Sequence, residues 1–334
     1  MSSFGSACPQ RCARVCFAGL VWLLMLAAAF LEMSTEFSQA QAQKPPANQA
    51  KPAMKPTEEQ EEGLIPPEVQ VQEADYASAR EVFHTKLVRR GPSPQKDPLP
   101  KAPENVTVVE IPSGSLRIKA WMNAPKDQTA KQPAILFLHG GMGFGEDDWV
   151  MTWALREAGY VVMVPMLRGE NGQAGDFTLF YDEVEDVLAA GDFLSKLPYV
   201  DAKRVYVAGH SIGGTLALLA AEASGRFKAA ASFSASPDQV IYCREGLRKE
   251  HIPFDSSDPR ELQMRSPMAY AGSLKSPTRL YYGTREPHFH LSSQRLVEVT
   301  RAKHLDVEAK RVLGGHDSAV AEAMKYCIDF FRAQ

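Results

Sequence analysis

The chain has 334 residues, of which 45% are hydrophobic and 23% are charged, and its formal net charge at pH 7 is -3. These proportions are typical of a globular protein and exclude a collagen-like or wholly disordered chain. The sequence lacks the basic excess that neutralises phosphates, so we expect no nucleic-acid partner.

Residues 1–40 have the pattern of an export signal. Arg11 and Arg14 precede an apolar run at residues 15–31, and small residues suited to signal peptidase follow around Ala40. The pattern predicts a secreted or periplasmic protein whose signal peptide is removed. The alternative is a membrane anchor, because such a run lies near the lower limit of about 17 residues for crossing a bilayer. In both cases the remainder of the chain lies outside the cytoplasm.

Residues 41–104 are rich in Pro, Gln, Lys, Glu and Ala and contain few side chains that could fill a core. This composition predicts an extended, largely disordered linker. Within it, residues 69–88 carry apolar side chains at near-helical spacing and could form a short helix that docks on the following domain. We therefore place the start of the folded domain at residue 105 and expect residues 105–334 to fold without the linker.

From residue 105 the sequence alternates between strand-like and helix-like segments. We expect strands at residues 106–111, 116–121, 134–138, 160–164, 204–208, 229–233, 279–282 and 306–312. We expect helices at residues 149–158, 180–197, 211–223, 292–304 and 318–332. Continuous apolar strands that alternate with helices predict an α/β domain with a mostly parallel eight-stranded sheet and helices on both faces.

The stretch at residues 234–276 is longer than a minimal crossover and predicts a small lid insertion. Its apolar side chains would form the underside of the lid, and they are Ile241, Tyr242, Ile252 and Phe254. Its basic side chains would face water or attract an anionic substrate group, and they are Arg244, Arg248 and Lys249.

The sequence contains five cysteines. Cys8, Cys12 and Cys16 lie in the export signal and lack the partners of a zinc site. Cys243 and Cys327 remain, and they could form a disulfide in an oxidising compartment. Spacing in the sequence does not show whether their Cα atoms approach closely enough, so a disulfide and two free thiols both stay open.

Ser211 lies where an apolar strand meets an Ala- and Leu-rich helix, within Gly209-His210-Ser211-Ile212-Gly213. In a Gly-x-Ser-x-Gly turn, the flanking glycines allow the serine to adopt a strained conformation that lifts its hydroxyl to the top of the sheet. Ligands of parallel sheets also bind at the carboxyl ends of the strands. The pattern predicts a nucleophile, and the alternative is an ordinary helix N-cap.

Three other strand ends offer the parts that a nucleophilic serine needs. The turn His139-Gly140-Gly141-Met142-Gly143 could present a backbone N–H, with Gly141 as first choice and Met142 as the alternative, which would hold an oxyanion together with the N–H of Ile212. A flexible glycine turn is the other interpretation, and His139 itself is expected to be structural.

Glu286 and His316 complete the set of predicted site residues. Glu286 follows the strand at residues 279–282, and a carboxylate there can orient a histidine, although a solvated loop charge is the alternative. His316 lies in a glycine turn after the last strand and could act as general base. His288 and His290 could line the same pocket. Because no second pair at ligand spacing accompanies them, we expect no metal. Acyl transfer through a serine also needs no organic cofactor, so we expect none.

The order Ser211, Glu286, His316 is the order in α/β-hydrolases. With these motifs, with "VVMVPMLRGENG" at residues 161–172 and with "RSPMAYAGSLKSPTRLYYGTREP" at residues 265–287, the chain resembles the α/β-hydrolase superfamily. Within it, the resemblance is to the catalytic domain of prolyl oligopeptidases and to dienelactone hydrolases. It implies that residues 105–334 form an α/β-hydrolase domain with Ser211 as nucleophile, His316 as base and the Glu286 position as acid.

The chain departs from this family pattern in three ways. The family usually has aspartate at the position of Glu286, the β-propeller of prolyl oligopeptidases is absent, and serine replaces the cysteine that dienelactone hydrolases often use. These departures favour a serine hydrolase that cleaves a carboxylic ester or related acyl bond of a small molecule through an acyl-enzyme. The alternatives are an exopeptidase on short peptides and a non-catalytic binding protein on a hydrolase scaffold.

Overall fold

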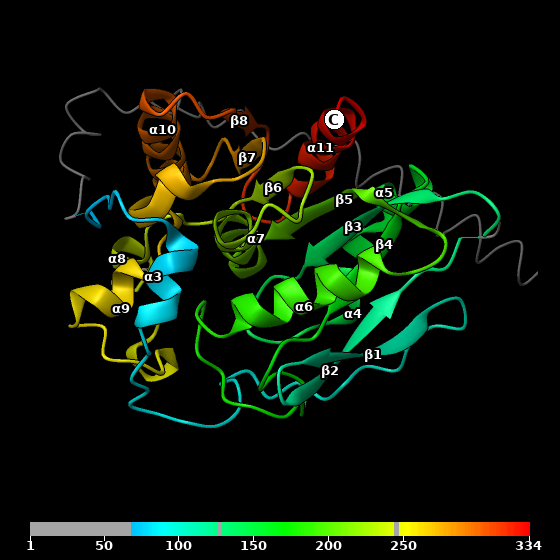
Figure 1. Ribbon diagram of the computed structural model, residues 1–334, viewed down its shortest axis with the longest axis horizontal. Coiled ribbons are helices and arrows are strands. Elements are labelled where there is room, and N and C mark those ends of the chain that lie inside the picture. The colour runs from blue at the N-terminus through cyan, green and yellow to red at the C-terminus, as the bar shows by residue number, and fades with distance from the viewer. Residues whose placement is uncertain (1–67, 126–127, 244–246) are drawn as a thin grey trace, which may run out of the picture. The chain divides into compact units, whose positions relative to one another are not determined.

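The computed structural model describes residues 68–334 apart from 126–127 and 244–246, and these residues contain an eight-stranded sheet with the order β1-β2-β4-β3-β5-β6-β7-β8 (Figure 1). β1 pairs with β2, and β2 with β4, in antiparallel fashion, and all other neighbours are parallel. The strands are β1 Thr107–Ser113, β2 Leu116–Met122, β3 Gln132–Leu138, β4 Val161–Pro165, β5 Val200–His210, β6 Ala230–Phe233, β7 Thr278–Gly283 and β8 Val307–Val312. The predicted α/β class and its mostly parallel sheet are confirmed.

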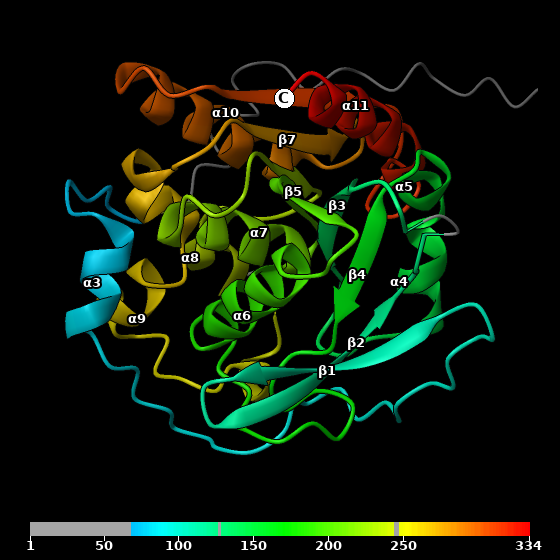
Figure 2. The same ribbon diagram turned by 45° about the vertical axis from the view of Figure 1, so that its right-hand side comes forward.

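Helices cover both faces of this sheet (Figure 1, Figure 2). Side chains of α6, α7 and α10 enter one apolar core, and side chains of α4, α5 and α11 enter the other. The helices are α3 Tyr76–Val82, α4 Glu146–Met151, α5 Trp153–Glu157, α6 Glu183–Ser195, α7 Ile212–Ala223, α8 Gln239–Ile241, α9 Pro259–Gln263, α10 Pro287–Ala302 and α11 Val320–Arg332, with 3-10 turns η2 Lys249–His251 and η3 Pro267–Ser273.

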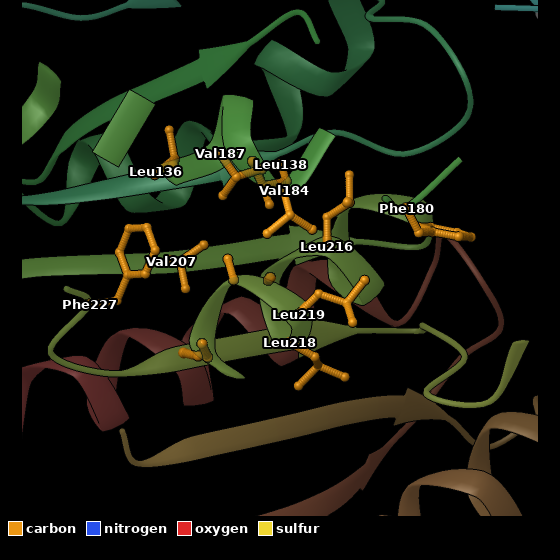
Figure 3. Packing of buried hydrophobic residues seen from close by; sticks show 14 of the residues in the cluster. Leu136, Leu138, Phe180, Val184, Val187, Val207, Leu216, Leu218, Leu219 and Phe227 are labelled. Carbon is orange, nitrogen blue, oxygen red and sulfur yellow. The ribbon is translucent and has the colours of Figure 1, made fainter. Parts of the chain in front are cut away.

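The two-sided burial explains why the central strands are continuously apolar. In β3, Leu136 packs in the core under α6 and α7, while its neighbours Ile135 and Phe137 pack in the opposite core. Figure 3 shows the first of these cores, where Leu136 and Val207 of the sheet face α6 and α7. Since successive side chains of a strand point to opposite faces, a strand buried on both faces needs an apolar residue at every position.

Residues 68–104, called here the N-terminal strap, lie against the domain, and this corrects the expected boundary at residue 105. The α3 helix lies beside α9 (Figure 1, Figure 2). The side chain of Tyr76 is completely buried, and its hydroxyl donates to the Met264 carbonyl at 2.9 Å. The Val69 N–H donates to Asp238 at 2.9 Å. The strap therefore supplies apolar side chains to the core, although its composition is that of a linker.

A buried arginine joins the strap to the rest of the domain. Arg265 is fully buried and pairs with Glu261, and its guanidinium donates to Thr85 of the strap at 2.8 Å and to the Leu179 carbonyl at 2.8 Å. Its guanidinium carbon lies 3.8 Å from the ring centroid of Phe254. Because a buried charge is tolerated only with such partners, these contacts fix the strap and the insertion together.

The predicted lid insertion, residues 234–276, is largely built into the body of the domain. Ile252 and Phe254 are 6% and 2% exposed, which makes them core residues, whereas Arg248 and Lys249 are exposed. Arg244 lies outside the described residues. Among the described residues of the insertion, Ser236, Ile241 and Tyr242 in its first part line the pocket described below.

Three other expectations from the sequence have simple outcomes. Cys243 and Cys327 are free thiols, so the disulfide alternative is wrong. Residues 1–67, which include the predicted export signal and its apolar run at residues 15–31, lie outside the described residues. Among residues 68–334 with their two gaps, no helix has the length and hydropathy needed to cross a bilayer.

Candidate active site

Ser211 occupies the sharp turn between β5 and α7. Its backbone has φ 54° and ψ -119°, in the left-handed region that side chains rarely adopt. A Cβ on Gly209 would lie 2.2 Å from the Gly213 carbonyl oxygen, and one on Gly213 would lie 2.1 Å from the Leu138 carbonyl oxygen. The turn therefore requires glycine at both positions, and the strain is consistent with a functional serine.

The structure brings the three predicted residues into one chain of hydrogen bonds. His316 Nε2 lies 3.0 Å from Ser211 Oγ, and His316 Nδ1 lies 2.9 Å from Glu286 Oε1. Each residue follows a different strand: Ser211 follows β5, Glu286 comes after β7 and His316 comes after β8. Because these parallel strands end at the same edge of the sheet, residues separated by up to 105 positions in the sequence meet there.

The Glu286 carboxylate is held by donors on both oxygens. Its Oε2 accepts from the Gly283 N–H at 2.6 Å and from the Ser234 hydroxyl at 2.7 Å. Burial raises the pKa of this carboxyl, but the hydrogen bonds from His316, Gly283 and Ser234 outweigh burial and keep the pKa below its ordinary value. Glu286 is therefore an ionised, oriented partner for His316.

Ser234 was not singled out in the sequence. Its signal is its position immediately after the strand β6, where its backbone has φ 46°. Serine is common in loops, and nothing in its immediate neighbourhood distinguishes it. Its role in the site becomes evident only from its hydrogen bond to Glu286 in the structure.

His210 adjoins Ser211 in sequence but does not contact the serine hydroxyl. Its Nε2–H donates to the His316 carbonyl at 3.1 Å, and the two imidazole rings lie 4.8 Å apart. Burial, together with the nearby His316, lowers the pKa of His210, which favours the neutral ring. His210 thus supports the backbone of the His316 turn.

In the turn after β3, the backbone N–H groups of Gly141 and Met142, the two alternative oxyanion donors, differ in their hydrogen bonds. The N–H of Met142 already donates to Gln95 at 2.9 Å, and the N–H of Gly140 donates to Asp148 at 3.2 Å. Within the described residues, the N–H groups of Gly141 and Ile212 donate no hydrogen bond. The Met142 N–H is thus already engaged, and Gly141 as the oxyanion donor stays a prediction.

His139 is buried beneath this turn. Its Nδ1–H donates to the Gly140 carbonyl at 2.8 Å, and its Nε2–H donates to Glu170 at 2.9 Å. Burial lowers the pKa of His139, but the Glu170 carboxylate outweighs it and raises the pKa to about 9. His139 is a positively charged structural support at neutral pH, and Glu170 is a second residue that the sequence does not reveal.

A cavity of about 570 Å³ opens in front of Ser211. Most of its exposed lining is apolar. His288 lines it, as expected, but His290 stacks on Tyr282 at a centroid distance of 5.2 Å and is not among the lining residues. The lining residues are Ser211, Ser236, Ile241, Tyr242, Arg285, Glu286, Pro287, His288, Phe289 and His316.

His210, His316 and Asp317 have donor atoms within 4.8 Å of one another, a spacing that could hold a metal ion. Both ring nitrogens of His316 are already bonded to Ser211 and Glu286, however. A metal on His316 would break those contacts, so the cluster fits the hydrogen-bonded arrangement better than a metal centre.

Comparison with known proteins shows which family the region around this site resembles. Residues 146–296, which include Ser211 and Glu286, match the sequence profile of the prolyl oligopeptidase family. Over these residues the chain is similar to the prolyl oligopeptidase family. It is therefore a serine hydrolase with the α/β-hydrolase fold, as the motifs imply.

Curated relatives carry both peptidase and esterase names. The uncharacterized peptidase YtmA of Bacillus subtilis is 25% identical over 196 residues, which cover 56% of this chain and 75% of that protein. The B. subtilis protein YitV, named for an esterase, is 25% identical over 231 residues, which cover 58% of this chain and 88% of that protein. The names thus do not distinguish an ester from a peptide bond.

A solved structure shows the same fold. The acylaminoacyl peptidase of Pyrococcus horikoshii superposes with a TM-score of 0.58 at 22% identity over 68% of this chain. The chain spans only 41% of that peptidase, so the likeness shows the fold of the matched part alone.

Proposed function

We propose that this protein hydrolyses carboxylic esters of small molecules through an acyl-enzyme on Ser211. The observation that carries the proposal is the hydrogen-bonded chain Ser211–His316–Glu286, which opens onto a largely apolar cavity. A hydrolase scaffold that only binds ligands would have no need for a strained serine turn and a fully bonded carboxylate.

In the proposed mechanism, Ser211 Oγ attacks the carbonyl carbon while His316 Nε2 takes its proton. The oxyanion accepts hydrogen bonds from the N–H groups of Gly141 and Ile212. The intermediate collapses, and the leaving alkoxide takes the proton from His316. Water then attacks the acyl-enzyme with His316 as base, which releases the acid and restores Ser211. Glu286 holds His316 in the required tautomer and stabilises its cation.

The cavity lining suits an ester substrate better than a peptide substrate that is bound by its terminal ammonium group. Ile241, Tyr242 and Phe289 offer apolar contacts to an acyl or alcohol group. An exopeptidase that grips a substrate ammonium needs a carboxylate for it, because a buried charge must be paired. Among the described lining residues the carboxylate is that of Glu286, and both of its oxygens already accept hydrogen bonds.

One observation favours the second candidate, an exopeptidase on short peptides. Arg285 is exposed and lines the same cavity, where it could pair with the terminal carboxylate of a peptide. The peptidase names of relatives point the same way.

The test compares p-nitrophenyl esters with aminoacyl p-nitroanilides on the full chain. We expect ester turnover to exceed anilide turnover, and Ser211→Ala to abolish turnover and labelling by a fluorophosphonate. Faster cleavage of the anilides would reject the esterase proposal in favour of the peptidase. Labelling that survives Ser211→Ala would reject the assignment of the nucleophile.

A further inference from the structure

The strap touches the turn that carries the proposed oxyanion donor. Gln95 Oε1 accepts from the Met142 N–H at 2.9 Å, and the Ser93 hydroxyl donates to the Met142 carbonyl. The amide nitrogen of Gln95 in turn donates to Asp97 at 2.6 Å. Both polar groups of the Met142 backbone are thus held by residues about 50 positions earlier in the chain.

These contacts fix the direction of the Gly141 N–H. In a trans peptide the C=O and the N–H point in opposite directions. The peptide that contains the Gly141 N–H is held on its other side, where the Gly140 carbonyl accepts from His139. The next peptide is held where the Met142 N–H meets Gln95. The Gly141 N–H therefore lies between two hydrogen-bonded backbone groups, the Gly140 carbonyl and the Met142 N–H.

Gln95 also lies directly against the backbone of Gly141. Gly141 has φ +66°, and a Cβ placed on it would be 3.0 Å from Gln95 Oε1. The left-handed conformation is tolerated by glycine but is not enforced by it, because glycine also populates other regions. A contact from outside the turn is needed to select one conformation.

The strap around Gln95 is itself anchored to the loop that follows β4. The Ser93 N–H donates to the Gly169 carbonyl at 2.9 Å, and the Phe177 N–H donates to the Gly91 carbonyl at 2.9 Å. The Gly91 N–H donates to Asp176 at 2.8 Å. Gln95 is therefore presented by a fixed segment and not by a loose tail.

We propose that Gln95 is a positioning residue for the oxyanion donor of Gly141, which makes the strap a working part of the active site. The proposal rests on the proposed hydrolase function. Gln95 does not touch the reacting atoms and acts through the backbone of residues 140–142. Donors aimed at the developing oxyanion contribute only if they are held in place before the reaction, so loosening the turn lowers the rate of the chemical step.

The test measures p-nitrophenyl acetate hydrolysis by the full chain with Gln95→Ala. We expect kcat to fall about 10- to 100-fold, since small misplacement of a catalytic group costs up to about 100-fold, while KM changes much less. A trifluoromethyl ketone, whose tetrahedral adduct with Ser211 carries an oxyanion that uses the same donors, should lose affinity by a similar factor. Gln95→Met, which keeps the volume and removes the acceptor, gives the same result if the alanine variant does not fold.

A polarity swap provides the rescue. In the double variant Gln95→Glu, Asp97→Asn, the introduced carboxylate still accepts from the Met142 N–H, and the introduced amide donates back to it. We expect this variant to recover most of the wild-type kcat. Gln72→Ala is the matched control, because Gln72 lies in the same strap and, among the described residues, its side chain bonds only to the Gln70 carbonyl. It should behave as wild type.

The outcomes separate this inference from the proposed function. A wild-type chain that neither hydrolyses esters nor labels at Ser211 would overturn the function itself. An active wild type with an unchanged kcat in Gln95→Met would overturn the positioning role alone. So would a loss of kcat that follows melting temperature and is not recovered by the swap, because that result indicates a stabilising contact only.

Discussion

Replacing Glu286 by glutamine tests the proposed site most directly. The side chain keeps its size, but all three of its present partners are donors: His316 Nδ1–H, the Gly283 N–H and the Ser234 hydroxyl. A carboxylate accepts from all of them, whereas an amide offers one oxygen and an NH₂ group that only donates. In either orientation of the amide, a donor faces a donor.

The magnitude follows from the two orientations. If the amide nitrogen faces His316, the ring proton must move to Nε2, which then faces Ser211 and cannot accept its proton. In other serine hydrolases such a wrong tautomer costs about 10⁴-fold in kcat. If the nitrogen faces Gly283, the tautomer survives, but an unsatisfied N–H costs about 1–3 kcal/mol and the charge that stabilises the imidazolium is lost. We expect kcat to fall about 10³- to 10⁴-fold.

The assay follows initial rates of p-nitrophenyl acetate hydrolysis, and circular dichroism checks the fold. Glu298→Gln is the matched control, because Glu298 lies on the exposed side of the helix α10 that begins just after Glu286. Glu286→Asp keeps the charge with a shorter reach, so it should retain more activity than the glutamine variant. A folded Glu286→Gln protein with kcat within tenfold of wild type would refute the role given to the carboxylate.

Three further predictions concern the framework of the site. A chain that starts at residue 101 lacks Tyr76 and Gln95, so it should melt at a lower temperature and lose ester hydrolysis. Gly213→Ala should prevent folding or abolish activity, because its Cβ would lie 2.1 Å from the Leu138 carbonyl oxygen. Glu222 is fully buried, its oxygens have no hydrogen-bond partner among the described residues, and burial raises its pKa. Glu222→Gln should therefore stabilise the protein, increasingly so as the pH rises.

The sign of the Glu222 effect follows from linkage. The folded state keeps the proton to a higher pH than the unfolded chain, so the wild type loses stability as the pH rises above about 4.3, the ordinary glutamate value. The advantage of Glu222→Gln should grow by up to about 1.4 kcal/mol per pH unit until the folded carboxyl ionises. Urea unfolding between pH 5 and pH 8 measures it. A pH-independent difference would contradict the linkage. Full activity of the chain that starts at residue 101, or of Gly213→Ala, would contradict the prediction made for that variant.

The residues at strand ends could be found in the sequence because each carries a local signal. Ser211 and His316 lie in glycine turns, and β-branched or apolar runs precede them. The bounds of the elements were less accessible. The last helix before β8 starts at Pro287 and not at residue 292, since proline is compatible with the first turn of a helix and the polar residues that follow conceal the start.

The near-helical spacing at residues 69–88 predicted a docked helix, which the structure shows as α3 Tyr76–Val82. The rest of the strap could not be predicted as part of the domain, because its evidence is not local. Tyr76 and Val69 lie in a segment rich in polar and charged residues, and their partners, about 170–190 positions later, make them core residues. The same holds for Gln95 and Ser234. Each is an ordinary polar residue in its own surroundings, and its role is set by a backbone or carboxylate brought near by the fold.

The long separations between the strap and its partners also constrain how the protein can assemble. The strap is synthesised before the elements that it packs against, and the Tyr76 N–H finds its acceptor at Ser273, 197 residues later. Until then its apolar side chains have no core to enter, and contacts of such separation form slowly because a long loop must be closed. A nascent chain that already contains the serine turn would therefore still lack the core partners of Tyr76, and it would lack Glu286 and His316 of the catalytic site.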